Sequence, residues 1–164
     1  MKSLRIALPA IISLIALSWL SPAWAENWSL MKHYSFDKLQ FVKEHPFAKQ
    51  HLVVQVSQGN PKRWTLVLNN TANVINYFGP DNIQVVVVAY GPGLKMIFKN
   101  SPVAQRIQSL SAEGVEFDAC HNTMLGFKKK LGHLPVLVPS AVVVPGGIVR
   151  IMQLEQHGFD YIKP

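Results

Sequence analysis

The most constraining feature of the sequence is a continuous apolar run in the middle of the chain. Residues 82–90, NIQVVVVAY, contain four consecutive valines and are followed by the turn GPG at 91–93. β-Branched residues favour strands, and a strand that is apolar on both faces is typically buried on both, as in a parallel sheet packed between helices. The run therefore predicts a central strand with a helical layer on each side.

Strand and helix patterns alternate through the rest of the chain. Short runs rich in β-branched residues predict further strands at 52–57, 115–120, 141–144 and 159–162, and apolar residues spaced by three or four predict helices at 63–78, 103–112, about 122–131 and 148–156. A short helical turn is expected at 94–98. In the last helix, Ile148, Ile151 and Met152 share one face. The alternation predicts a single α/β domain, a three-layer sandwich around a mostly parallel sheet of about five strands.

The N-terminus has the order of a secretory signal peptide. Lys2 and Arg5 precede an apolar stretch at 6–20, and the A-x-A motif at 23–25 follows. An uncleaved anchor is the competing interpretation, but the stretch is shorter than the roughly 20 residues that span a bilayer. We expect cleavage after Ala25 and a periplasmic or secreted chain of 164 − 25 = 139 residues.

After the signal peptide, residues 26–50 have no sustained period and predict an N-terminal arm, and 51–164 form the α/β domain. The arm is rich in aromatic residues: Trp28, Phe36, Phe41 and Phe47. Exposed apolar surface commonly marks an interface. These side chains therefore cover either a neighbouring subunit or their own domain.

The net positive charge of the chain does not point to a nucleic-acid partner. Loss of Lys2 and Arg5 lowers the formal net charge from +7 to +7 − 2 = +5. The remaining charges are scattered, and the densest cluster, 128–130, fits one solvated face of a helix. Export removes most encounters with nucleic acid, and no membrane contact is expected after cleavage. A basic surface remains compatible with small anions.

Cys120 is the only cysteine, so it forms no disulfide within the chain. A single cysteine in an exported protein is either a reactive thiol, an intermolecular crosslink or a small buried apolar side chain. Its position favours reactivity, because it ends a predicted strand and precedes a predicted helix. Ligands of α/β sheets bind beyond the carboxyl ends of the strands, and the first amides of a helix stabilise a thiolate.

The neighbours of Cys120 bear on its chemistry. His121 adds positive charge when protonated, although adjacent residues on a strand point in opposite directions. Asn122 or Thr123 is suited to cap the helix. Glu116 and Asp118 alternate with Cys120 and so share its face of the strand. They are either solvated or paired near the sheet edge, or Asp118 tunes the thiol.

Other turns are expected at the same edge of the sheet as Cys120. They lie at 57–59, 90–93 and 144–147. Glycines in the last two permit a close approach of backbone to a ligand and leave amides free to bind an anion. The candidate wall residues are Tyr90, Gly91, Pro145 and Gly146.

No motif indicates a metal or a cofactor. The six histidines form neither H-x-x-x-H nor a Cys/His cluster at ligand spacing. The chain has no haem attachment motif, no dinucleotide fingerprint and no nucleophile elbow of a hydrolase. We therefore predict no metal and no cofactor, and we disfavour hydrolysis.

Three segments together resemble the DsrE/DsrF-like family of small sulfur-relay proteins, in particular its exported members. They are VVVVAYGPG at 85–93, GVEFDACHNT at 114–123 and VVVPGGIVRIMQLEQHGFDYIKP at 142–164. The resemblance covers about 51–164. It implies a flavodoxin-like sandwich that assembles as trimers or hexamers. It also implies that Cys120, at the strand-to-helix position, accepts persulfide sulfur.

The sequence therefore predicts a periplasmic, homo-oligomeric sulfur-relay protein that carries a persulfide on Cys120. His121, Asn122 and Thr123 would bind the charged sulfur between the walls at 90–91 and 145–146. Its partners would be sulfur donor and acceptor proteins or small sulfur compounds. The alternative is a non-catalytic ligand-binding or assembly module in which Cys120 is buried and inert.

Overall fold

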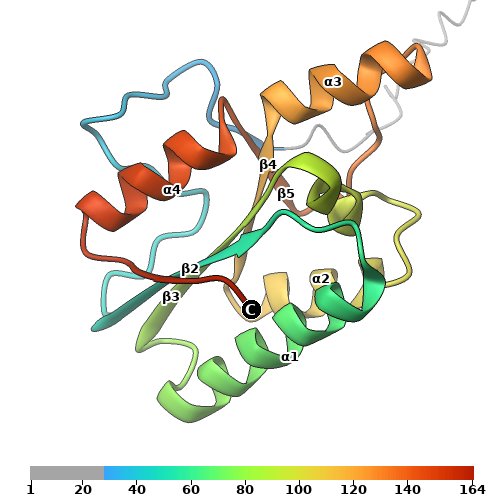
Figure 1. Cartoon of the computed structure of the whole chain (residues 1–164). Helices are drawn as coiled ribbons and strands as arrows, with labels where there is room; N and C mark the ends of the chain where they lie inside the picture. The colour runs from blue at the N-terminus through green and yellow to red at the C-terminus, as the bar shows by residue number, and fades with distance from the viewer. Residues whose placement is uncertain (1–27) are drawn as a thin grey trace, which may run out of the picture.

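The computed structural model describes residues 28–164, so the predicted signal peptide at 1–25 lies outside the described residues. Within this range the chain forms a six-stranded sheet in the order β1-β5-β4-β3-β2-β6, and every strand pair is parallel. Helices cover the sheet on each side (Figure 1). The predicted α/β sandwich with a parallel sheet is confirmed, and it is consistent with a flavodoxin-like architecture.

The elements follow the predicted alternation closely. The strands are β1 (Trp28–Ser29), β2 (Gln50–Val56), β3 (Ile83–Ala89), β4 (Glu116–Cys120), β5 (Ala141–Val144) and β6 (Asp160–Ile162). The helices are α1 (Pro61–Phe78), the short 3-10 helix η1 (Gly91–Ile97), α2 (Ala104–Ala112), α3 (His121–Leu131) and α4 (Gly147–Gln156). No helix within residues 28–164 is long and apolar enough to cross a membrane.

Strand β3 lies at the centre, and all of its residues are buried. Val85 and Val87 pack into the main core with α1, η1 and α2. Val86 and Val88 point to the opposite face and pack with Ile151 of α4. The valine run is therefore apolar on both sides because each side meets its own helical layer.

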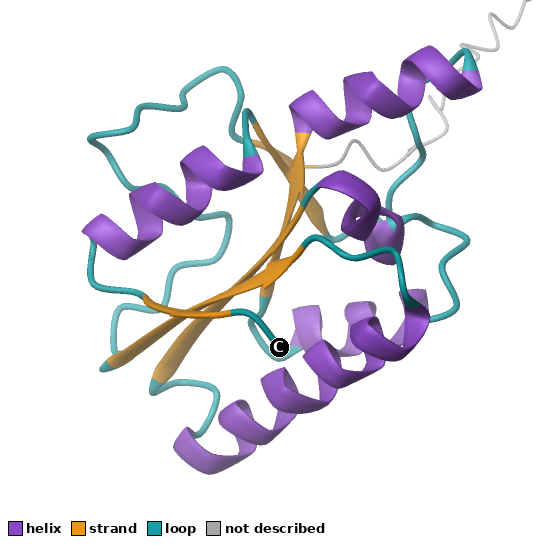
Figure 2. Cartoon of the chain, in the orientation of Figure 1, coloured by secondary structure: helices purple, strands orange, loops and turns teal. Residues whose placement is uncertain are grey.

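The two layers differ in composition. Helices α1, η1, α2 and α3 supply the first layer, whereas among residues 28–164 the second layer consists of α4 and the segment preceding β2 (Figures 1 and 2). The described part of the arm, 28–50, packs against the domain at 51–164. Its described residues add the sixth strand, because β1 pairs with β5. Phe41 packs against Phe159, with ring centroids 5.8 Å apart, so the arm covers its own domain here, whereas Phe47 is 78% exposed.

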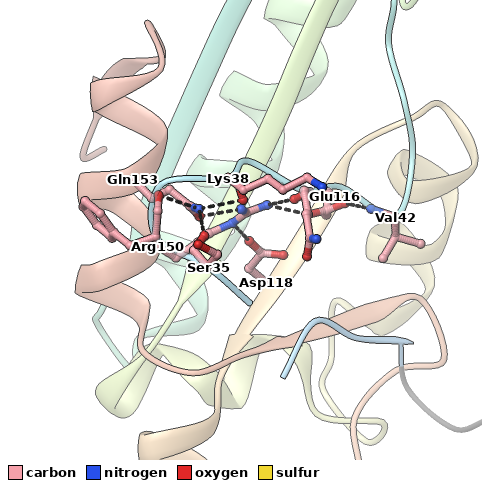
Figure 3. Close-up of polar contacts among 9 residues, drawn as sticks. Ser35, Lys38, Val42, Glu116, Asp118, Arg150 and Gln153 are labelled. Carbon is pink, nitrogen blue, oxygen red and sulfur yellow. Dashed lines mark hydrogen bonds and ion pairs between the residues drawn. The ribbon is translucent and has the colours of Figure 1, made fainter. Parts of the chain in front are cut away.

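A buried arginine joins the arm to the sheet (Figure 3). Arg150 of α4 is fully buried. Its Nε donates to Asp118 Oδ2 at 2.8 Å, and its Nη2 donates to Glu116 Oε1 at 3.0 Å and to the Gln40 carbonyl at 2.9 Å. Its Nη1 donates to Gln153 Oε1 at 2.9 Å. One guanidinium therefore connects β4, α4 and the arm.

Two further groups hold the arm backbone against this arginine. Gln153 Nε2 donates to the carbonyl oxygens of Ser35 and Phe36 at 2.8 and 3.1 Å. The Val42 amide donates to Glu116 Oε2 at 2.8 Å. Glu116 and Asp118 are therefore paired and buried, and the solvated interpretation of these two residues is wrong.

We predict that Arg150→Met destabilises the protein strongly. Methionine keeps much of the side-chain length but leaves Glu116 and Asp118 buried without a counter-charge. Removal of one partner from a buried ion pair costs about 3–5 kcal/mol. Urea unfolding of the two proteins at neutral pH measures this difference. The matched control Arg63→Met, at an exposed position on α1, should change the free energy of unfolding by less than about 0.5 kcal/mol; equal stability of both variants would contradict the prediction.

Candidate functional site

The carboxyl ends of the central strands meet at one edge of the sheet. Ala89 of β3 lies opposite Ala119 of β4, and Cys120 lies opposite Val144 of β5. The chain then leaves β3 through Tyr90 and leaves β5 through Pro145. The structure therefore brings the predicted turns at 90–93 and 144–147 to the strand-to-helix junction at Cys120. The predicted turn at 57–59 follows β2 at the same edge, where the Gly93 amide donates to the Ser57 carbonyl at 3.1 Å.

Cys120 is the last residue of β4 and the N-cap of α3. Its side chain makes no capping hydrogen bond, it forms no disulfide, and it is 5% exposed. The expectation that Asn122 or Thr123 caps the helix is wrong, because β4 runs into α3 without a loop and the helix already begins at His121. Serine, threonine, asparagine and aspartate are the favoured N-caps, so a cysteine at this position adds little to helix stability.

Helices α3 and α4 leave this edge toward opposite faces of the sheet. Met124 of α3 packs in the main core, whereas Ile151 of α4 packs in the second cluster. A crevice forms where neighbouring parallel strands are followed by helices on opposite faces, and ligands of α/β proteins bind at such points. Cys120 and Pro145 flank this point, and the Asn122 amide donates to the Pro145 carbonyl at 3.3 Å across it.

The side chains of the predicted site have distinct positions. Thr123 Oγ1 accepts a hydrogen bond from the Gly91 amide at 3.0 Å, which joins α3 to the start of η1. Gly91 has φ +53°, a conformation that favours glycine. Asn122 is exposed and lies beside Gly146, where an added Cβ would come within 3.7 Å of Asn122 Nδ2. His121 is half-buried, and within residues 28–164 no hydrogen bond or ion pair joins it to Cys120.

Tyr90 links the strand ends to α4. A Cβ on Gly147 would lie 2.8 Å from the Tyr90 Cβ, so the first turn of α4 contacts Tyr90 directly. The Gln55 amide donates to the Tyr90 hydroxyl and to Ser57 Oγ, and the Tyr161 hydroxyl donates to Gln55 Oε1. Sequence reasoning missed Gln55 and Tyr161. A glutamine within the apolar run of β2 was the available signal.

The buried charges lie on the same face of β4 as Cys120, since side chains alternate along a strand. Burial raises the pKa of Glu116 to about 8; the charge of Asp118 adds to this rise and that of Arg150 opposes it. Burial also raises the pKa of Asp118, against the lowering effect of Arg150. Asp118 Oδ1 accepts no hydrogen bond from any group within residues 28–164. A proton on Glu116 can supply this hydrogen bond. A shared proton thus removes the excess negative charge of two carboxyl groups around one guanidinium.

Sequence reasoning also missed Arg150 and Gln153. The spacing of Ile148, Ile151 and Met152 predicted the helix but does not mark its buried face, because Ile148 and Met152 are about half exposed. The buried face of α4 contains Arg150, Ile151, Gln153 and Leu154. An arginine within an apolar segment was the only signal, and its carboxylate partners lie on a different element.

No metal site is formed by the described residues. Within 28–164, no three His, Cys, Asp or Glu side chains come close enough together to hold a metal ion. The histidines lie apart: His45 Nε2 is 3.1 Å from the Gly114 carbonyl oxygen, and His157 Nδ1 is 2.7 Å from that of Gln153.

Comparisons with known proteins identify the fold without a function. A scan against models of protein families and a search of curated proteins both found no match. Among solved structures, the chain is similar to a protein of unknown function from Methanobacterium thermoautotrophicum. The two share 25% identity with a TM-score of 0.64, over 71% of this chain and 100% of the other. The protein is thus a small α/β sandwich protein, and its membership of the DsrE/DsrF-like family stays a prediction.

We predict that Glu116→Gln changes how stability depends on pH. The pKa of Glu116 is higher in the folded protein, about 8, than the ordinary 4.5, so the folded state keeps a proton that the unfolded chain releases. Stability is full below pH 4.5 and falls as pH rises to about 8. Glutamine mimics the protonated carboxyl and removes this fall, so above pH 8 the variant should be more stable than wild type by on the order of 1–2 kcal/mol.

Urea unfolding at several pH values tests the Glu116 prediction. Glu113→Gln, at an exposed position after α2, serves as the matched control and should keep the wild-type pH dependence. If Glu116→Gln loses stability over the same pH range as wild type does, another group holds the proton.

Proposed function

We propose that this protein is an exported, periplasmic sulfur-binding carrier in which Cys120 holds a persulfide. The main support is the position of Cys120 at the crevice between the carboxyl ends of β4 and β5, at the start of α3. The backbone amides at the start of a helix stabilise a negative sulfur. A residue poorly suited to N-capping occupies the N-cap, which favours a chemical role over a structural one.

The loading step needs no external oxidant. The Cys120 thiolate attacks a sulfane sulfur of polysulfide or thiosulfate and forms a new S–S bond. The S–S bond of the donor breaks, and its electron pair leaves with a shorter polysulfide or with sulfite. Transfer to an acceptor thiolate reverses this step, so the protein is a carrier or sulfurtransferase rather than a hydrolase.

The neighbouring residues suit a charged sulfur. In this proposal His121, Asn122 and Thr123 of α3 would bind the charged sulfur, and Tyr90-Gly91 and Pro145-Gly146 would form the walls of its site. Because Cys120 is only 5% exposed, small inorganic sulfur compounds reach the thiol more readily than a protein donor. Acceptor proteins then require a local opening of the crevice.

Exposed apolar residues support the homo-oligomer. Ile148, Val149 and Met152 on the outer face of α4 are 43–51% exposed. Such a face beside the crevice suits contact with a second copy. We propose a trimer or hexamer, with this face of α4 at the interface.

The burial of Cys120 favours a second candidate function. A cysteine that is 5% exposed behaves as a small apolar side chain when nothing opens its surroundings. In that case the protein is a non-catalytic ligand-binding or assembly module.

Sulfur loading distinguishes the two candidates. Mature protein incubated with polysulfide or thiosulfate should gain the mass of one sulfur atom, measured by intact mass spectrometry, and reductant should remove it. Cys120→Ser should gain nothing. Because serine is a favoured N-cap, this variant should fold with wild-type stability or up to about 1 kcal/mol more.

Thiol labelling of the native protein completes this test. A carrier should react with a small alkylating reagent before unfolding. If Cys120 labels only in denaturant and no sulfur adduct forms, the carrier function is wrong and the binding module stands.

A further inference from the structure

A cleft of about 320 Å³ opens between η1 and α3. Its α3 wall consists of Thr123, Gly126, Phe127 and Lys130, which follow one another at helical spacing and so form one stripe of the helix. The opposite wall is the first part of η1. Cys120 does not line the cleft. The volume lies at the small end of the range of small-molecule sites.

The floor of the cleft is apolar and contains an aromatic ring. Phe127 is partly buried and packs edge-on against Phe98, with ring centroids 5.2 Å apart. Pro92 faces it from η1. This arrangement offers a flat surface to a flat apolar group, and aromatic groups stack on such surfaces.

Two lysines stand at the rim, one on each wall. Lys95 comes from η1 and Lys130 from α3. Lys95 Nζ lies 5.9 Å from the centre of the Phe127 ring, so its charge is directed over the floor. No acidic side chain lines the cleft. Neither lysine forms an ion pair with a described residue, so a ligand with one negative charge finds two counter-charges here.

A glycine keeps the middle of the cleft open. Gly126 lies inside α3, where glycine costs about 1 kcal/mol relative to alanine. An added Cβ at this position would meet nothing within 4 Å. Packing therefore does not require this glycine, and its side-chain space belongs to the cleft.

We propose that this cleft binds a small organic anion with a flat apolar body, such as an aryl sulfonate or aryl carboxylate. The ring lies on Phe127 above Gly126, and the anionic group lies between Lys95 and Lys130. The proposal does not depend on sulfur carriage, because Cys120 does not line the cleft, although Gly91 and Thr123 border both the cleft and the crevice.

The probe for this site is naphthalenesulfonate, with neutral naphthalenemethanol for comparison. Calorimetry should give saturable binding of the sulfonate with a dissociation constant of about 1 mM or tighter. Protein NMR shifts should map it to η1 and α3. No saturation by about 10 mM, or equal affinity for the neutral compound, would overturn the proposal.

Variants test the two parts of the site separately. Gly126→Leu should fill the cleft and weaken binding at least about tenfold, and it should melt no lower than wild type because glycine is the poorer helix former. The double change Lys95→Gln with Lys130→Gln should weaken binding about fivefold.

Two controls keep the result specific. Lys128→Gln with Lys129→Gln removes the same number of charges from α3 at positions outside the cleft and should change affinity by less than about twofold. Cys120→Ser should bind as wild type does, whether or not the protein carries sulfur. Undiminished binding by Gly126→Leu would place the ligand elsewhere and overturn the assignment.

Discussion

The Arg150 guanidinium is the interaction on which the second face of the sheet depends. Within the described part of the chain, 28–164, that face has a single helix, α4, because the three preceding connections all lie on the other side. The segment before β2 covers the remaining area without regular structure, so its backbone groups need polar partners. Arg150, Gln153 and Glu116 supply them at Gln40, Ser35, Phe36, Lys38 and Val42. On this face, the buried charge cluster therefore holds the irregular segment in the place where a second helix would otherwise pack by apolar contacts.

The same cluster fixes the geometry around the thiol. Asp118 and Cys120 belong to one face of β4, and Arg150 holds Asp118 against α4. The first turn of α4 is in turn positioned by the contact of Gly147 with Tyr90 at the end of β3. The groups around the crevice between β4 and β5 are thus held by the Arg150 hydrogen bond to Asp118 and by the contact of Gly147 with Tyr90.

Helix α3 serves two separate surfaces. Its N-terminus follows Cys120 directly and faces the crevice, whereas the stripe from Thr123 to Lys130 faces η1 and forms the cleft. Thr123 lies at the boundary, because its hydroxyl accepts the Gly91 amide that begins η1. The lysines at the end of this helix divide accordingly. Lys130 lines the cleft, while Lys128 and Lys129 are exposed outside it, in agreement with the solvated face expected for the cluster.

The sequence by itself determined the α/β class, the element order and the strand-to-helix position of Cys120. These are local properties: the valine run, the helical spacing and the Gly/Pro turns act over a few residues each. Tertiary structure decided which charges are buried, because Arg150 meets Glu116 and Asp118 across 34 and 32 residues of chain. It also decided the covering of the second face by the arm, the polar link from Gln55 to Tyr161 and the cleft beside Gly126. Each of these depends on the packing of distant segments, which periodicity within one element does not encode.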